Sequence, residues 1–508
     1  MITNSSYTKA FFTLNQQVEQ LKRRGMDCGD KTRAYEVLER YGYYRLSGYW
    51  HPYRQFPRPP LSHKDEKGRE IRLDDFEQGT SLEQVVDIYN FDAELRAKLG
   101  HALSSVEVAF RFFIGHRMGR LDPFIHRNPQ LLKKMVTDDQ GLSKPTSGYS
   151  KWIKEYERSE NSAKSSFVQH FRDKYGEHLP IWVATEVMTF GNLSNFFNLM
   201  PQSDRKIIAD RLQIGQSDGS GHIIGEIDTL SNWLNSFRHA RNLCFHYSRI
   251  WNRVYDVVIK APGIATQTKD HVLSSLSDDR INNRLYGILL ILRYVLLSVS
   301  PDDRQVINIA RSIKTRCTAL SLNLSDAGFP TDWEKNPIWD EAFQLDPSQM
   351  LAGSLVDRLE TVTVKNAKAL LRAENMPNGS FISTQQLSPK KVRQLLRGYS
   401  KAQEIISFKL AGTVHYPKFQ FRDGTIAPEV AQLNRLLMQR CQETESTRTA
   451  AALIEWWLAP NTELPVQKNK TQMSPLNAFN LGVLASENSS LALNTFAGRY
   501  GSAAESTL

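Results

Sequence analysis

Hydrophobic and polar positions alternate with the period of an amphipathic helix through the first two thirds of the chain. The pattern is clear in four stretches, at residues 81–120, 182–213, 224–258 and 280–321. Stretches rich in glycine, proline or polar side chains separate these runs, at residues 57–68, 138–148, 176–180 and 215–221. The pattern therefore predicts a mainly α protein whose larger part is a helical bundle.

A change of composition between residues 325 and 350 predicts a domain boundary near residue 342. The stretch DAGFPTDWEKNPIWDEAF contains prolines and tryptophans, and the chain after it is richer in Thr, Ser, Asn and Gln. We expect a helical domain at 1–341, a connecting segment at 342–415 and a smaller, mostly helical C-terminal domain at 416–508. Within the last of these, Tyr416–Phe421 predicts a short extended run and Arg422-Asp423-Gly424 a turn.

Residues 233–254, WLNSFRHARNLCFHYSRIWNRV, carry the candidate chemistry. On a helical wheel of about 100° per residue, one face is apolar and suits core packing. Within about 80° on roughly the opposite side, the wheel places Arg238, Asn242, His246, Arg249 and Arg253. Arg241 lies at the border, about 140° from His246.

A face of arginines around a histidine suits phosphate chemistry. Guanidinium groups bind phosphate oxygens in pairs and keep their charge, and histidine exchanges a proton near neutral pH. Cleavage of RNA without a metal needs a proton moved off the 2′-OH, a proton delivered to the 5′-oxygen and cations on the phosphorane. The alternative interpretation is that this face is an ordinary solvated helix surface.

The segment RNLCFH at Arg241–His246 resembles the R-x4-6-H motif of HEPN ribonucleases. Around it stand YGYYRLSGYWHPYR (41–54), GTSLEQVVDIYNFDAELR (79–96), SSVEVAFR (104–111), IWVATEVMTFGNLSNFF (181–197), RHARNLCFHYSRIWNR (238–253) and GFPTDWEKNPIW (328–339). In that order these motifs resemble the Abi (AbiD/AbiF-like) abortive-infection proteins over residues 10–341.

This resemblance implies a phage-defence or toxin-type, metal-independent endoribonuclease with a HEPN-like bundle. It implies that Arg241, Asn242 and His246 are catalytic and that the protein is a homodimer acting on RNA. We expect RNA-binding roles for Arg238, Arg249 and Arg253, and no cofactor.

The C-terminal third resembles the toxin-binding domain of Xre/MbcA/ParS-type antitoxins. The resemblance rests on YPKFQFRDGTIAPEV, ALIEWWLAPNTEL and SPLNAFNLG between residues 416 and 482, and it is lost at PVQKNKTQM. It implies a contact module that restrains the ribonuclease or binds a protein or RNA antitoxin partner. Residues 342–415 would hold a degenerate helix-turn-helix. The alternative is a non-catalytic regulator that binds RNA or protein.

Charge and cysteine content limit the other function classes. Lys and Arg number 64 against 54 Asp and Glu, a net charge of +10 that is compatible with a polyanionic partner. The four cysteines are scattered without zinc-ligand spacing, and no phosphate-binding glycine loop stands in a strand–helix context. With no apolar run long enough to cross a bilayer, we expect a cytoplasmic protein without membrane contact.

Three further features keep two interpretations each. Tyr41–Arg54 combines aromatic and basic residues, for core packing or for stacking on bases. The i,i+4 pairs Asp92/Arg96 and Glu107/Arg111 predict ion pairs within one helix, unless Glu107 or Arg111 faces His246 instead. Trp456 and Trp457 are either both buried or divided between core and partner surface.

Overall fold

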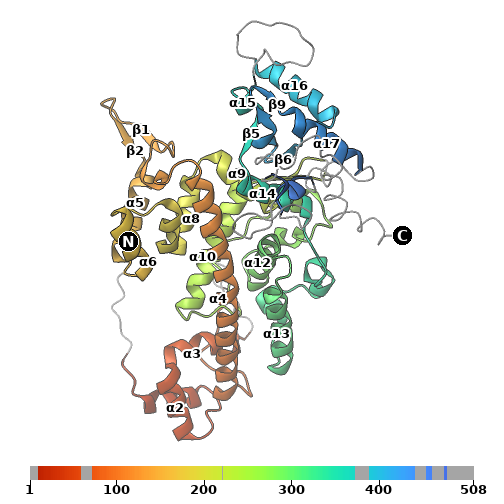
Figure 1. The fold of residues 1–508 in the computed structure, drawn as a ribbon. Helices are drawn as coiled ribbons and strands as arrows, with labels where there is room; N and C mark the ends of the chain where they lie inside the picture. The colour runs from red at the N-terminus through yellow and green to blue at the C-terminus, as the bar shows by residue number, and fades with distance from the viewer. Residues whose placement is uncertain are drawn as a thin grey trace.

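The computed structural model describes residues 10–58, 64, 71–219, 221–371, 388–440, 453–459 and 474–476. It is mainly helical, as the hydrophobic pattern predicted, with short strands only (Figure 1). The largest hydrophobic core draws its residues from 18–345. Two smaller cores form within residues 352–457, joined by Ile207, and within 362–431. The domain boundary near residue 342 stays a prediction.

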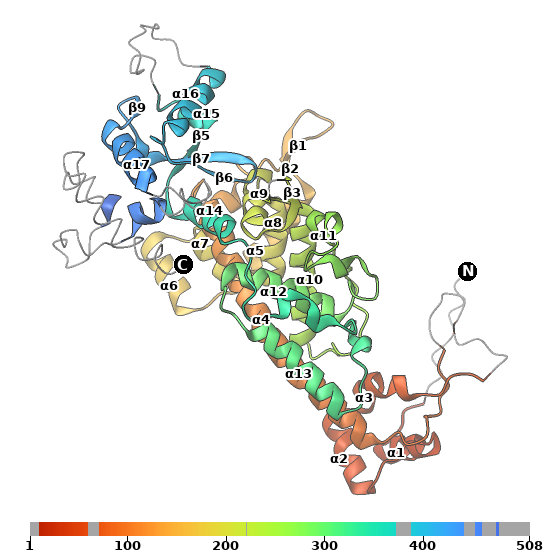
Figure 2. The same ribbon diagram turned by 90° about the vertical axis from the view of Figure 1, so that its right-hand side faces the viewer.

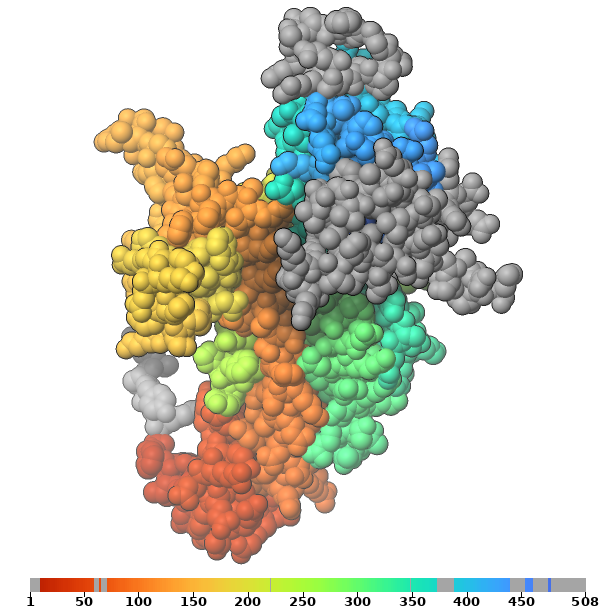
Figure 3. Space-filling view, viewed as in Figure 1, coloured from red at the N-terminus to blue at the C-terminus, as the bar shows by residue number. Residues whose placement is uncertain are grey.

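Helix α4, Leu82–Gly119, is the central element of the bundle. Its 38 residues span about 57 Å at 1.5 Å per residue. Ser81 caps its start, where the Ser81 hydroxyl accepts a hydrogen bond from the backbone N–H of Gln84. Helix α3 packs at this end, α10, α12 and α13 pack along its length, and α7 packs near its C-terminal end (Figures 1 and 2). In the space-filling view α4, in orange, still reaches the surface between the yellow and green helices (Figure 3).

Three α-helices precede α4, and five shorter α-helices and two hairpins follow before α10. The early helices are α1 (Leu14–Arg23), α2 (Lys31–Tyr41) and α3 (Tyr43–Trp50). The next are α5 (Ser147–Ser162), α6 (Ser166–Tyr175), α7 (Ile181–Val187), α8 (Phe190–Leu199), α9 (Gln202–Arg211) and, after α10, α11 (Gly263–Gln267). The hairpins pair β1 (Met135–Thr137) with β2 (Ser143–Pro145) and β3 (Gly215–Ser217) with β4 (Ile223–Gly225).

The run at 182–213 contains three helices, α7, α8 and α9. Thr189, in the TFGN sequence, is the N-terminal cap of α8. Its side chain accepts a hydrogen bond from the backbone N–H of Asn192. Pro201 then precedes α9. Two of the breaks inferred from composition, at 138–148 and 215–221, contribute residues to hairpins that the sequence did not predict.

The run at 224–258 ends much earlier than expected. Helix α10 covers Ile227–Phe245, and His246 is its C-terminal cap, donating its backbone N–H to the carbonyl of Asn242 at 2.9 Å. Tyr247 follows with a φ of +56°, which no right-handed helix contains. The prediction that residues 233–254 form one continuous helix is therefore wrong, and Arg249 and Arg253 do not share a helix face with Arg238.

The run at 280–321 divides into α12 (Leu285–Val299) and α13 (Gln305–Ala319). Helix α12 is buried on almost every side, including Arg293, whose guanidinium donates to the carbonyls of Asp303 and Ile338. No helix among the described residues combines the length and the apolar character that crossing a bilayer requires.

Beyond residue 345 the described chain mixes helices with a small sheet. Its helices are α14 (Pro347–Arg358), α15 (Val364–Ala367), α16 (Pro389–Lys401) and α17 (Pro428–Arg440). The antiparallel sheet has the order β5-β7-β6, from Thr361–Thr363, Thr413–Pro417 and Phe408–Leu410. A second hairpin pairs β8 (Phe421–Arg422) with β9 (Thr425–Ile426).

The turn predicted at residues 422–424 is confirmed. The extended run predicted at Tyr416–Phe421 is wrong in its centre, because β7 ends at Pro417 and a 3-10 helix covers Lys418–Gln420 before β8 begins. Asp423 and Gly424 both have positive φ, as a two-residue hairpin turn requires. Trp456 and Trp457 are both buried, so neither is an exposed contact. The antitoxin-like segment at 460–473 lies outside the described residues.

Candidate functional site

The chemistry predicted for Arg241 and His246 lies at the C-terminal end of α10, where that helix crosses α4. We call Glu107, Arg241, Asn242 and His246 the helix-end site. Arg241 Nε lies 3.6 Å from Oε2 of Glu107, and its guanidinium lies 4.8 Å from the centre of the Phe245 ring. The Arg241 side chain remains 35% exposed. Its guanidinium is thus held in place but still open to a ligand on one side.

Glu107 joins two arginines. Its Oε1 accepts a hydrogen bond from Arg111 at 3.0 Å, and Arg111 also lies 3.5 Å from Glu186 and donates to the carbonyl of Met188. The predicted Glu107/Arg111 ion pair is therefore present. Glu107 contacts Arg241, a link that helical spacing alone could not reveal because the two residues are on different helices.

His246 is exposed at the end of α10. His246 is the C-terminal cap of α10, and the chain turns after it. The backbone N–H of His246 donates to the carbonyl of Asn242. An exposed imidazole and a partly exposed guanidinium at the same helix end suit binding of a phosphodiester. One chain supplies only one such pair.

Asp92 fixes the turn that follows His246. It is fully buried, and its carboxylate accepts the backbone N–H groups of Ile250 (3.2 Å) and Trp251 (2.7 Å). Tyr49 donates its hydroxyl to the same carboxylate at 2.6 Å, and Arg96 pairs with it. The predicted Asp92/Arg96 ion pair is present. The same Asp92 carboxylate also holds the turn that follows His246 in place.

The Tyr41–Arg54 segment packs against this same turn. Arg45 donates to the carbonyl of Tyr247 at 3.3 Å, and the carbonyl of Gly48 accepts from Arg249. Trp50 is buried, whereas Tyr44 is 91% exposed. This segment therefore contributes core packing and also leaves an aromatic ring at the surface.

The three predicted RNA-binding arginines do not share one helix face. Arg238 remains on α10 and donates to the amide oxygen of Asn235. Arg253 lies beyond the helix and pairs with Asp256 at 3.5 Å. Arg249 is half-buried behind the turn, where burial lowers its pKa. The common basic face expected for these residues is absent because the helix ends before two of them.

Exposed apolar side chains lie on the two helices that the Glu107–Arg241 pair joins. Val108 and Phe112 are exposed on α4, and Phe245 is exposed at the end of α10, followed by Tyr247. The Phe245 ring approaches Gly100 of α4, where an added Cβ would come within 3.4 Å of it. An apolar surface thus adjoins the helix-end site.

Metal coordination finds no basis in the part of the chain that the structure describes. No cluster of three or more His, Cys, Asp or Glu side chains there is arranged to hold an ion. Cys28, Cys244 and Cys317 are buried and free, and burial raises the pKa of Cys244 to about 12, so this thiol is not a nucleophile.

One region of the chain, which includes the helix-end site, matches a known protein family. No curated protein and no solved structure matches the chain. Residues 36–252 match the family model of Abi-like proteins. The match begins in α2 and ends just after Trp251, so it includes α3, α4, α10 and the turn that Asp92 holds. This part of the chain is therefore similar to Abi-like proteins.

Proposed function

We propose that this protein acts in phage defence by abortive infection, as a metal-independent endoribonuclease whose catalytic residues are Arg241 and His246. The observation that carries the proposal is the helix-end site itself. A guanidinium held by Glu107 and an exposed imidazole stand five residues apart, within the region similar to Abi-like proteins.

The residues suit cleavage by the 2′-OH of the RNA itself. His246 would take the proton from the 2′-OH, whose oxygen attacks phosphorus while the bond to the 5′-oxygen breaks. Arg241 would stabilise the charge on the phosphorane. The products are a 2′,3′-cyclic phosphate and a 5′-OH, and the leaving oxygen needs a proton from a second acid.

A second copy of the chain would supply that acid. Two helix-end sites facing each other across a twofold axis would place two imidazoles and two guanidiniums at one phosphodiester. The exposed side chains of Val108, Phe112 and Phe245 adjoin the site and would be covered in such a dimer. The HEPN-like character of the bundle belongs to this proposal.

A second candidate function is RNA binding without cleavage. It is favoured by the ion pair between Arg241 and Glu107, which already offsets part of the guanidinium charge. In this case the protein would hold RNA or a protein partner as a regulator.

A cleavage assay separates the two functions. The full chain is incubated in EDTA with tRNA and total RNA, beside His246→Ala, Arg241→Ala and the control His170→Ala, an exposed histidine on α6. We expect His246→Ala to slow cleavage at least about 100-fold, because general acid–base catalysis contributes about 10²–10⁴. Arg241→Ala should also slow cleavage about 100-fold or more, because stabilising charge in the transition state contributes about 10²–10³. Equal cleavage by wild type and both variants would refute the nuclease; RNA binding without any cleavage would favour the regulator.

The restraining role of the C-terminal part is also a proposal. Its described contacts with the bundle include the C-terminal end of α4, α9 and the β3–β4 hairpin, where Gln349 donates to the carbonyl of Ile223. Arg120 donates to the carbonyl of Val356, and Arg211 pairs with Asp357. These contacts would fix the C-terminal part against the same helix that carries Glu107.

A further inference from the structure

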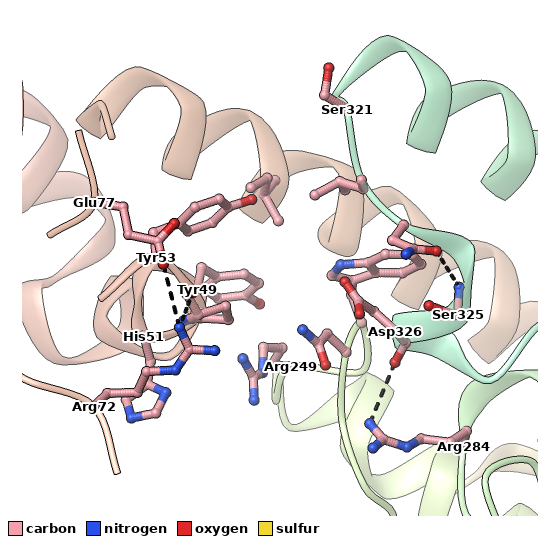
Figure 4. Close-up of a pocket in the computed structure, with 16 residues that line it drawn as sticks. Tyr49, His51, Tyr53, Arg72, Glu77, Arg249, Arg284, Ser321, Ser325 and Asp326 are labelled. Atoms are coloured by element: carbon pink, nitrogen blue, oxygen red, sulfur yellow. Dashed lines mark hydrogen bonds and ion pairs between the residues drawn. The ribbon is translucent and has the colours of Figure 1, made fainter. Parts of the chain in front are cut away.

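A cleft of about 550 Å³ lies behind the turn that Asp92 holds, and nothing in the nuclease proposal uses it. Three separate segments form its walls: the end of the Tyr41–Arg54 segment, the turn at 249–252, and the loop 321–326 that follows α13. Figure 4 shows these segments facing one another across the opening. Its volume is in the range of small-ligand sites.

Two arginines in this cleft have no carboxylate within ion-pair distance among the described residues. Arg249 donates to the carbonyl of Gly48, and Arg284 donates to the backbone carbonyl of Asp326 at 3.4 Å. The third arginine, Arg72, lies 3.7 Å from Glu77, so its charge is already balanced (Figure 4). The cleft therefore holds positive charge that the described residues around it neutralise only in part.

Both guanidiniums are positioned before any ligand arrives. Arg249 is half-buried and fixed by Gly48. The stem of Arg284 packs against Gly328, where a Cβ would come within 2.5 Å of the Arg284 Cβ, and Gly328 has a φ of +82°. Cations held in this way lose little conformational entropy when they bind an anion.

The remaining walls offer aromatic and hydrogen-bonding groups. Tyr53 supplies a ring face that is partly exposed. Burial, together with the Asp326 carboxylate, raises the pKa of Tyr53, so its hydroxyl remains a donor at neutral pH. Guanidiniums for a phosphate and an aromatic ring for a base are groups that suit a nucleotide.

We propose that the Arg249–Arg284 cleft binds a nucleoside 5′-phosphate, with the two guanidiniums on the phosphate. The nucleotide is either free or the 5′-terminal residue of an RNA, since both present the same phosphomonoester. This site is distinct from the helix-end site. Arg249 thus serves phosphate binding in the cleft rather than beside His246.

Calorimetric titration of the full chain tests the proposal. The ligands are each of the four nucleoside 5′-monophosphates, the matching nucleosides, inorganic phosphate, and RNA oligonucleotides with and without a 5′-phosphate. We expect saturable binding of at least one 5′-monophosphate or of the 5′-phosphorylated RNA, and at least tenfold weaker binding of the form that lacks the phosphate. Binding of the free nucleotide alone identifies a small-molecule ligand; preference for the phosphorylated RNA identifies an RNA end.

Variants locate the binding. Arg284→Gln should weaken it at least tenfold, whereas Arg280→Gln should leave it unchanged, because Arg280 lies four residues earlier and its side chain is 89% exposed. His246→Ala should bind as wild type does, which makes the result independent of nuclease activity. The proposal is overturned if no phosphorylated ligand binds, if a folded Arg284→Gln variant binds normally, or if His246→Ala abolishes binding.

Discussion

Oε2 of Glu107 lies 3.6 Å from Nε of Arg241, across the interface between α4 and α10. The distance is longer than a hydrogen bond, and the Nε atom is buried without a hydrogen-bond partner. Glu107 therefore positions Arg241 and offsets its charge while leaving the contact loose. A phosphate that binds Arg241 competes with this carboxylate.

Replacing Glu107 should consequently strengthen RNA binding. In Glu107→Gln the negative charge is lost while the side-chain shape is kept, so RNA affinity measured at low salt should rise about 3- to 10-fold, the effect of about 1 kcal/mol. The control is Glu94→Gln, an exposed glutamate on the same helix. Unchanged or weaker RNA binding by Glu107→Gln would contradict this role.

Asp92 should be among the most costly positions to change. In Asp92→Asn, Arg96 loses its buried partner and the N–H groups of residues 250 and 251 lose their charged acceptor. We expect a loss of about 3–5 kcal/mol in the free energy of unfolding, the usual cost of breaking a buried ion pair. Urea denaturation measures it, with the exposed Asp87→Asn on α4 as control. If Asp92→Asn lowered the free energy of unfolding no more than the control does, the turn would not depend on Asp92.

The dimer predicts sensitivity at an exposed apolar position. Val108 is 61% exposed, so Val108→Asp should leave the folded monomer intact and should lower the dimer fraction in sedimentation experiments. Cleavage should fall in parallel, because each site lacks its second imidazole. Val136→Asp, on the exposed β1 strand away from α4, is the matched control. A monomeric wild type with full cleavage would exclude the dimer.

Acid should destabilise the bundle through His126. Both ring nitrogens are buried without a hydrogen-bond partner, and burial, with a smaller effect of Arg127, lowers the pKa of this histidine from 6.5 to about 3. As pH falls below 6.5, His126 becomes protonated in the unfolded chain but stays neutral in the folded chain. Stability should therefore drop by about 2 kcal/mol between pH 7 and pH 5 from this group alone.

His126→Phe tests this titration. Urea unfolding at both pH values should show a smaller loss of stability in the variant than in wild type, while the exposed His170→Phe should keep the wild-type loss. Half-buried His271 and buried His415, each with a pKa lowered to about 4, should maintain part of the dependence of stability on pH. An identical slope in His126→Phe and wild type would rule His126 out.

Restraint by the C-terminal part predicts a gain of toxicity. Asp357→Ala removes the partner of Arg211 without touching the helix-end site, so the full-length variant should slow bacterial growth more than wild type when induced. Glu360→Ala, which removes an exposed ion pair with Lys418, should behave as wild type. Lower toxicity of Asp357→Ala at equal expression would oppose restraint.

Sequence periodicity predicted the helical fold and the position of α4 well, because a long run of apolar positions leaves few alternatives. It failed where tertiary contacts compete with helix formation. Residues 246–254 continue the helical pattern of α10, but Asp92, more than 150 residues away, binds the N–H groups that a longer helix would use. A distant buried acceptor leaves no signal in the local pattern.

The candidate site was predicted in part. Arg241 and His246 were found through the R-x4-H motif, and the structure places them at one helix end. The contact of Glu107 with Arg241 depends on the crossing of two helices, so spacing could only suggest Glu107 as a neighbour of the site. Arg284 lies outside the predicted basic face, and its proximity to Arg249 requires the folded loop at 321–326.

The length of α4 couples regions that seem independent in the sequence. Near its start this helix carries Asp92, in its middle Glu107, and near its end His116 and Arg120, which contact the C-terminal part. A continuous helix behaves as a stiff lever, so a tilt imposed at one end displaces the other. Binding or release of a ligand at the C-terminal part would thus tilt α4 and displace the segment of this helix that contacts Arg241.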